Sequence, residues 1–153
     1  MTRSSSSRSD WPIQQIASDV AEIYAWLDRR RVQGEPSTPC RKCGQCCDFD
    51  AFGHRLFITT PEWVHFRTAL GDQAPLPMAE GRCPYNEAGV CRVYATRFAG
   101  CRIFGCGLDA AAQSDLTESA MAKLKALCIR HALPYRYTDL REALNGLWTG
   151  IGL

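Results

Sequence analysis

Apolar residues recur at steps of three and four between positions 11 and 31, with polar residues at the positions between them. The recurring residues are Ile13, Ile16, Val20, Ile23 and Leu27. This spacing places them on one face of an amphipathic helix, so we predict a helix over residues 11–31. Asp10 can cap this helix, Pro12 is tolerated in its first turn, and the Arg29-Arg30-Arg31 run complements the negative end of the helix dipole.

Shorter patterns predict a strand and a second helix. Residues 54–59, with the sequence HRLFIT, form a short strand candidate. Thr60-Pro61-Glu62 then combines a cap, a first-turn proline and an early acid, which is typical of a helix start. We expect this second helix to end near Gly71. Further along, a turn is predicted at Glu87-Ala88-Gly89, between short apolar runs.

The C-terminal part predicts two more helices. In the longer one, Ser114 or Thr117 is the cap, Pro134 is the stop, and one face carries Leu116, Ala120, Leu124 and Leu127. Thr138 caps a short last helix that runs to Leu144 or Leu147. The chain is therefore expected to form a mainly α small domain with short strands and irregular loops.

The length of 153 residues and the hydrophobic content of 46% suit a single compact domain. Residues 1–10, MTRSSSSRSD, lack the apolar segment of a secretory signal. We interpret them as a disordered tail, and residues 11–153 as one cytoplasmic domain. No apolar stretch approaches the ~20 residues needed to cross a bilayer. The net charge of +2, from 18 basic and 16 acidic residues, argues against nucleic-acid and membrane partners.

The unusual feature of the composition is its nine cysteines. They occupy positions 40, 43, 46, 47, 83, 91, 101, 106 and 128. Cytoplasmic thiols stay reduced, so clustered cysteines indicate metal or redox chemistry. A disulfide scaffold is the alternative, but the odd count and the missing export signal weigh against it. Cys128 falls on the apolar face of a predicted helix, where a buried free cysteine is common, and we leave it out of the site.

The first four cysteines follow the pattern C-x2-C-x2-C-C and are Cys40, Cys43, Cys46 and Cys47. A loop with this spacing can wrap around a cluster and direct three sulfurs at it, as in bacterial ferredoxins. A remote cysteine followed by proline often supplies the fourth ligand there, and Cys83-Pro84 fits that description. The favoured cofactor is therefore an iron–sulfur cluster of the 4Fe-4S type, held by irregular metal-binding loops.

Zinc is the alternative metal. Structural zinc sites usually combine paired C-x2-C knuckles or cysteine–histidine pairs, and the three histidines show no such pairing. We expect His54 close to the cluster, and His65 and His131 to be ordinary helix residues. Cys83 to Cys91 and Cys101 to Cys106 can still complete tetrahedral sites, so the spacing does not divide the eight cysteines among sites.

Basic residues crowd the cysteines in the sequence. Arg92 and Arg102 directly follow Cys91 and Cys101. Thiolate-ligated clusters carry net negative charge, and hydrogen bonds to sulfur tune their potential and stability. Such a role is open to both arginines, although a solvated surface position is the favoured interpretation of either one taken alone.

These residues resemble the CxxCxxCC zinc- or iron-chelating domain family, also called YkgJ-like. The resemblance covers about residues 40–106 and rests on Cys40 to Cys47, Cys83-Pro84-Tyr85, Gly89 to Tyr94, Arg97 and Cys101 to Cys106. The chain departs from the family at Phe98 and Gly105, where the family commonly has proline. The resemblance implies metal chelation by Cys40, Cys43, Cys46, Cys47, Cys83, Cys91, Cys101 and Cys106. Residues 107–153 then form a helical C-terminal part outside this family-like core.

Three functions are open at this point. The favoured one is a metal-cluster protein for electron transfer, iron handling or support of a partner enzyme, acting with a protein partner. The first alternative is a structural zinc module that presents a surface to protein or RNA. The second is a cluster-dependent oxidoreductase or methylase-like enzyme, because a relative, flagellin lysine N-methylase, joins a similar cysteine region to methyl transfer. A substrate pocket beside the cluster would favour that second alternative.

Overall fold

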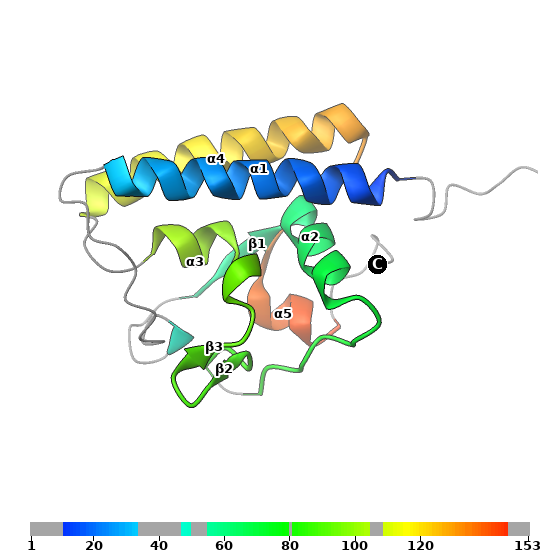
Figure 1. Ribbon diagram of the computed structural model, residues 1–153, viewed down its shortest axis with the longest axis vertical. Coiled ribbons are helices and arrows are strands. Elements are labelled where there is room, and N and C mark those ends of the chain that lie inside the picture. Colours follow the sequence, from blue (N-terminus) through cyan, green and yellow to red (C-terminus); the bar gives the residue numbers. More distant parts are fainter. Residues whose placement is uncertain (1–10, 34–46, 50–54, 80, 105–108, 147–153) are drawn as a thin grey trace, which may run out of the picture.

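The computed structural model describes residues 11–33, 47–49, 55–79, 81–104 and 109–146. The described part is mainly helical with two small antiparallel sheets, which confirms the predicted fold class. The helices are α1 (Ile13–Gln33), α2 (Thr60–Leu70), the 3-10 helix η3 (Tyr94–Thr96), α3 (Ala99–Ile103), α4 (Ala110–His131) and α5 (Leu140–Leu144). The strands are β1 (Phe57–Thr59), β2 (Asn86–Glu87), β3 (Val90–Cys91) and β4 (Tyr137–Asp139). In Figure 1, α1 and α4 lie side by side along one edge, and the shorter elements form a second layer beneath them.

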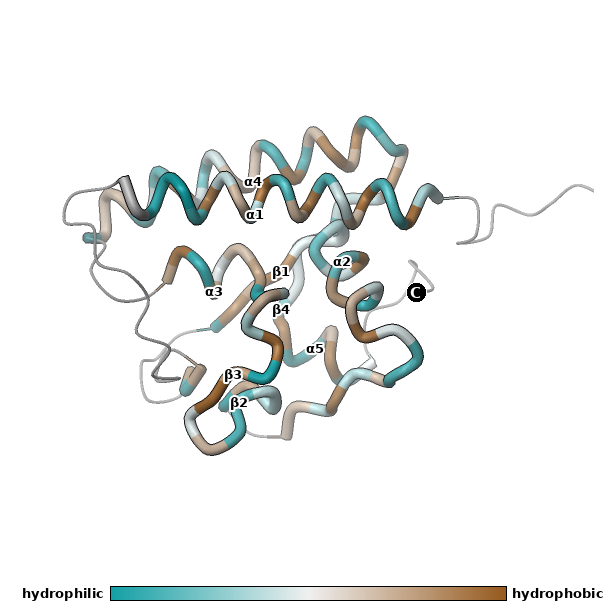
Figure 2. Tube along the Cα trace, in the orientation of Figure 1, coloured by the Kyte–Doolittle hydropathy of each residue, from teal (hydrophilic) through white to brown (hydrophobic). Residues whose placement is uncertain are grey.

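The α1–α4 layer is held together by the apolar faces that the sequence predicted. Ile16, Val20 and Leu27 of α1 are at most 1% exposed, and Leu124 and Leu127 of α4 are equally buried. Figure 2 shows brown and teal bands alternating along both helices, as one-sided burial requires. Each such buried side chain contributes roughly 1.5–3 kcal/mol, so this seam is a main source of stability.

Helix α2 begins where the sequence predicted, with its cap shifted by one residue. Thr59, rather than Thr60, has the extended backbone of the capping position, and Pro61 follows in the first turn. The Glu62 carboxylate turns back to accept the Thr59 N–H at 3.0 Å, as in a capping box. Gly71 ends the helix at a φ of +63°, a conformation that glycine adopts without steric cost.

Helix α4 starts earlier than the sequence predicted. Its cap is Asp109, whose carboxylate accepts the Ala112 N–H at 2.7 Å, and neither Ser114 nor Thr117 caps it. Alanine follows at positions 110–112. Because alanine has a high helix propensity, the helix can begin before its apolar face does. Thr117 lies inside the helix, where its hydroxyl donates to a backbone carbonyl one turn earlier.

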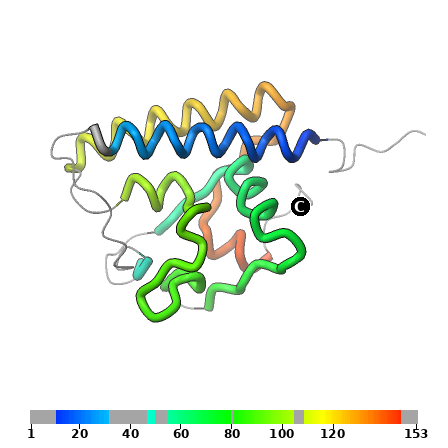
Figure 3. Tube along the Cα trace, in the orientation of Figure 1, coloured from blue at the N-terminus to red at the C-terminus, as the bar shows by residue number. Residues whose placement is uncertain are grey.

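The C-terminal segment forms a strand that the sequence analysis did not predict. Tyr137–Asp139 pairs antiparallel with Phe57–Thr59, so that Ile58 lies opposite Thr138. Thr138 is therefore a strand residue, and Asp139 caps α5 by accepting the Arg141 N–H at 2.7 Å. Figure 3 shows the two paired segments, far apart in colour along the chain, running next to each other.

A second apolar cluster underlies the segment from Cys83 to Cys101. Phe66 of α2 lies at its centre, with ring centroids 5.4 Å from Tyr85 and 5.1 Å from Phe98. The partly buried Cys83 and Cys101 pack against this cluster, so two of the predicted ligands are anchored on a rigid aromatic base.

The hairpin of β2 and β3 extends from this second layer, on the side away from α1 and α4 in Figure 1. Its two turn residues, Ala88 and Gly89, have φ values of +53° and +83°. Positive φ at both central positions is the geometry of a two-residue hairpin turn, which confirms the predicted turn. The hairpin places Cys91 opposite Asn86.

Among the described residues, no helix combines the length and apolar character needed to span a membrane. Several expectations lie outside the described residues and are not addressed by the structure: the tail 1–10, including the Asp10 cap, the position of His54, and an end of the last helix at Leu147.

Candidate metal centre

The structure describes four of the eight predicted ligands. These are Cys47, Cys83, Cys91 and Cys101, and each is partly buried. Cys40, Cys43, Cys46 and Cys106 lie outside the described residues. The ninth cysteine, Cys128, is 2% exposed in the α1–α4 core, as predicted, and burial raises the pKa of its thiol to about 11.

Cys47 and Cys83 are brought together by a short antiparallel pairing. The Cys83 N–H donates to the Cys47 carbonyl at 3.0 Å, and the Phe49 N–H donates to the Gly81 carbonyl at 2.8 Å. The pair of residues between them, Asp48 and Arg82, forms a β-bridge. As a result, the Cys47 and Cys83 thiols are hydrogen-bonded to each other. The pairing joins Cys47, at the end of the CxxCxxCC stretch, to Cys83 of the remote Cys-Pro pair.

Cys101, on α3, lies within electrostatic reach of the same group. Burial raises the pKa of its thiol to about 12, with further increases from the charges of Cys47 and Cys91. The pKa of Cys83 is raised by its hydrogen bond to Cys47, by burial, and by the charge of Cys101. Cys101 thus interacts electrostatically with Cys47, Cys83 and Cys91, which come from two separated stretches of the chain.

Backbone amides point at two of these sulfurs. The N–H of Tyr85 donates to Cys83, and the N–H of Phe98 donates to Cys101; each bond lowers the pKa of its thiol against the larger effects that raise it. Amide-to-sulfur bonds stabilise thiolates and are a usual feature of thiolate–metal sites. A bound cation would stabilise the thiolates further. It would lower the pKa of the thiols, opposite to the effect of burial.

Within the described ranges, no three Cys, His, Asp or Glu side chains lie close enough together to hold one metal ion. The Cys47 and Cys83 thiols are hydrogen-bonded to each other, and Cys101 interacts with Cys47, Cys83 and Cys91 through charge. A complete coordination shell would therefore need the described cysteines to come closer together, or it would need ligands from the four cysteines outside the described part.

The two arginines that follow cysteines differ sharply. Arg92 is exposed and pairs with Glu87 at 2.7 Å, as the solvated-surface interpretation predicted. That interpretation is wrong for Arg102, which is 7% exposed and bonded within the protein. The local sequence is Cys-Arg in both cases, so only the tertiary environment separates them.

The described histidines are helix residues, as predicted. His65 packs edge-on against Tyr24, with ring centroids 5.1 Å apart, and burial together with the charge of Arg102 lowers its pKa. His131 lies 2.9 Å from the Asp19 carboxylate, at the seam between α4 and α1. Both therefore serve the packing of the helical layer.

The sequence predicted Glu62 only as a residue of the helix start, and its role as a buried hydrogen-bond acceptor was not predicted. Its side chain is fully buried and accepts four hydrogen bonds, two of them from Tyr24 and Ala99. Its place three residues after Thr59 signalled the capping role, but nothing local signalled the partners from α1 and α3.

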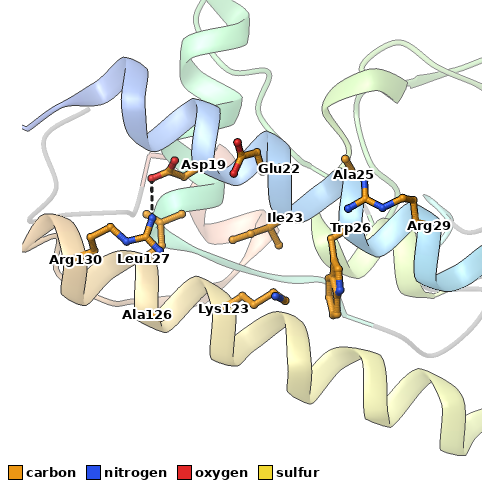
Figure 4. Close-up of a pocket in the computed structure, with 10 residues that line it drawn as sticks. All are labelled: Asp19, Glu22, Ile23, Ala25, Trp26, Arg29, Lys123, Ala126, Leu127 and Arg130. Carbon is orange, nitrogen blue, oxygen red and sulfur yellow. Dashed lines mark hydrogen bonds and ion pairs between the residues drawn. The ribbon is translucent and has the colours of Figure 1, made fainter.

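A groove of about 480 Å³ lies between α1 and α4 (Figure 4). Ile23, Trp26 and Leu127 are among its lining residues, and an ion pair between Asp19 and Arg130 lies at one end. None of the residues that line it is a cysteine.

The chain shows no match to models of known protein families, to curated proteins or to solved structures. The resemblance to the CxxCxxCC family therefore stays a prediction that rests on the cysteine pattern.

Proposed function

We propose that the chain is a metal-binding protein that holds an iron–sulfur cluster and serves electron transfer, iron handling or the support of a partner enzyme. The ligands of the proposal are Cys40, Cys43, Cys46, Cys47, Cys83, Cys91, Cys101 and Cys106. The observation that carries it is the pairing of Cys47 with Cys83, because it joins the CxxCxxCC stretch to the second set of cysteines.

The surroundings of the sulfurs support the same proposal. Partly buried thiols on an aromatic base are shielded from water, and amide N–H groups already donate to Cys83 and Cys101. Shielding and amide bonds are two of the means by which proteins stabilise clusters and set their reduction potentials. A 4Fe-4S cluster uses four thiolates, so eight cysteines exceed the need of one cluster and leave others for a second site or a structural role.

A structural zinc site is the second candidate. The observation that favours it is that charge interactions link Cys101 to Cys47, Cys83 and Cys91, and a tetrahedral zinc needs four thiolates, although no three of the described side chains are close enough to hold a metal ion. In that case the metal would contribute mainly to folding, and the surface around it would meet a protein or RNA partner.

An enzyme is less well supported. A cluster-dependent oxidoreductase or methylase needs a substrate pocket beside the metal, and the groove between α1 and α4 contains no cysteine.

Anaerobic purification with analysis of iron, acid-labile sulfide and zinc tests the proposal. A brown protein with broad visible absorbance, iron and matching sulfide is the expected result. Stoichiometric zinc in a colourless protein would select the structural zinc site. A reduced sample that holds neither metal, even after anaerobic reconstitution with ferrous iron and sulfide or with zinc, would overturn both candidates.

A further inference from the structure

Arg102 is a buried cation next to a predicted ligand. It directly follows Cys101, and its side chain is 7% exposed, although arginine is seldom buried unless it is paired. Its Nη1 donates to the Asp28 carboxylate at 2.7 Å, and its guanidinium lies 4.3 Å from the centroid of the Tyr24 ring. Asp28 and Tyr24 both belong to α1, so Arg102 ties the short helix α3 to the long helical layer.

The same guanidinium also fixes the chain between Cys91 and Cys101. Its Nε donates to the Arg97 carbonyl at 2.9 Å, and its Nη2 donates to the Ala95 carbonyl at 3.0 Å. Ala95 lies in η3 and Arg97 directly follows it, so both carbonyls belong to the segment that leads from the hairpin to α3. The planar fork of arginine can hold several acceptors at once, which the single point charge of lysine cannot do with the same geometry.

Glu62 fixes the other side of Cys101. Its Oε1 accepts the Ala99 N–H at 2.6 Å, two residues before Cys101, and the Tyr24 hydroxyl at 3.1 Å. Its Oε2 accepts the Thr59 N–H and hydroxyl at 3.0 and 2.9 Å. Tyr24 thus receives Arg102 on its ring face and donates its hydroxyl to Glu62, so one side chain of α1 connects both anchors.

We propose that Arg102, together with Glu62, is a positioning residue of the metal centre, which holds Cys101 in place relative to Cys91 before any metal binds. The inference rests on the proposed metal-binding function and deepens it. A ligand that is already ordered loses less conformational freedom when metal binds, so metal affinity rises. Losses of outer-shell partners typically reduce metal affinity 10–100-fold.

Arg102→Gln tests the inference, with Arg92→Gln as the matched control. Both variants remove a guanidinium directly after a cysteine, but Arg92 is exposed and pairs with the equally exposed Glu87. Each reduced apoprotein is titrated anaerobically with Co²⁺, whose visible absorbance reports thiolate ligation, and then competed with Zn²⁺. We expect the dissociation constant of Arg102→Gln to rise about 10–100-fold with altered Co²⁺ bands, and that of Arg92→Gln to change less than about threefold.

Asp28→Asn keeps the test decisive if Arg102→Gln does not fold. Asp28 is 48% exposed, so its replacement removes the ion pair from Arg102 without opening the core. We expect a smaller weakening of metal binding than for Arg102→Gln, with unchanged helical circular dichroism. Arg102→Lys keeps the positive charge but lacks the planar guanidinium. We expect its metal affinity to stay nearly as low as that of Arg102→Gln.

Two failures can be told apart. If the wild-type protein binds metal and both Arg102→Gln and Asp28→Asn bind it equally well while folded, the positioning role is overturned and metal binding stands. If folded, reduced wild-type protein binds neither Co²⁺ nor Zn²⁺ nor an iron–sulfur cluster, both proposals are overturned.

Discussion

The backbone N–H of Cys83 donates to the carbonyl oxygen of Cys47 at 3.0 Å, and the two thiols are hydrogen-bonded as well. Two sulfurs from separate parts of the chain therefore meet. The fold itself brings them close, through a short antiparallel pairing on one side of an aromatic core.

The first prediction concerns Cys83. Cys83→Ser should abolish or strongly reduce metal loading, because serine removes a proposed ligand thiolate together with its contact to Cys47. Iron, sulfide and zinc analysis after anaerobic reconstitution measures the loss. Cys128→Ser is the control: it should cost about 1–3 kcal/mol, since it places a hydroxyl in an apolar core, but leave the metal content unchanged. Loss of metal in Cys128→Ser would show that its exclusion from the site is wrong.

The second prediction concerns the end of α4. Ala132 has the left-handed conformation there, with a φ of +54°, although glycine usually occupies this position. Ala132→Gly should stabilise the protein by about 0.5–1 kcal/mol, because it removes the steric cost of the left-handed conformation. Ala126→Gly makes the same chemical change inside the helix and should destabilise by about 1 kcal/mol. Urea unfolding measures both, and equal signs would contradict the prediction.

The third prediction concerns acid stability. A hydrogen bond from His131 is the main cause that lowers the pKa of Asp19 from its ordinary value of 3.8. A hydrogen bond from Gln15 and the positive charge of Arg130 lower it further, and burial opposes them. Because the folded-state pKa is lowered, the stabilisation is present above the unfolded-state value and is lost as the pH falls through the folded-state value.

Asp19→Asn should therefore reduce stability by about 1 kcal/mol at pH 6 and by much less near pH 2. Thermal unfolding of the two proteins across this range gives the difference at each pH. A difference that stays constant with pH would mean that the charge of Asp19 adds nothing beyond the shape of its side chain.

The fourth prediction concerns Gly100, which lies between Ala99 and Cys101. A methyl group at this position would overlap the Cδ1 methyl of Leu56. Gly100→Ala should cost about 1–3 kcal/mol, the range for overpacking a core. Because Leu56→Val removes the overlapping methyl, the double variant should be more stable than the sum of the two changes by about 0.5–3 kcal/mol. Additive losses would mean that Leu56 moves aside freely.

The long helices could be predicted because each has many turns over which an apolar face repeats. Helix α3 and strand β4 could not, because five and three residues carry too little periodicity to stand out. Strand β4 forms because β1 offers it backbone partners far away in the sequence, and no local pattern encodes that pairing. The start of α4 was missed because Asp109 precedes the apolar face rather than adjoining it.

The candidate site shows the same division. The spacing of the cysteines and the proline after Cys83 are local signals, so the candidate ligands could be named from the sequence, but the particular pairing of Cys47 with Cys83 could not. The contrast between Arg92 and Arg102 could not be predicted either, because both follow a cysteine. Asp28 and Tyr24 distinguish them, and both lie on a helix that is remote in sequence.

The ladder between β1 and β4 has a consequence for how this protein can be divided. The strand that follows the CxxCxxCC stretch completes its pairing only with residues near the C-terminal end of the described chain, and α4 supplies half of the seam that covers α1. A fragment cut after residue 106 would lose both. The cysteine-bearing segment is thus not an independent folding unit. If it were grafted alone onto another scaffold, it would lack the strand and helix against which it packs.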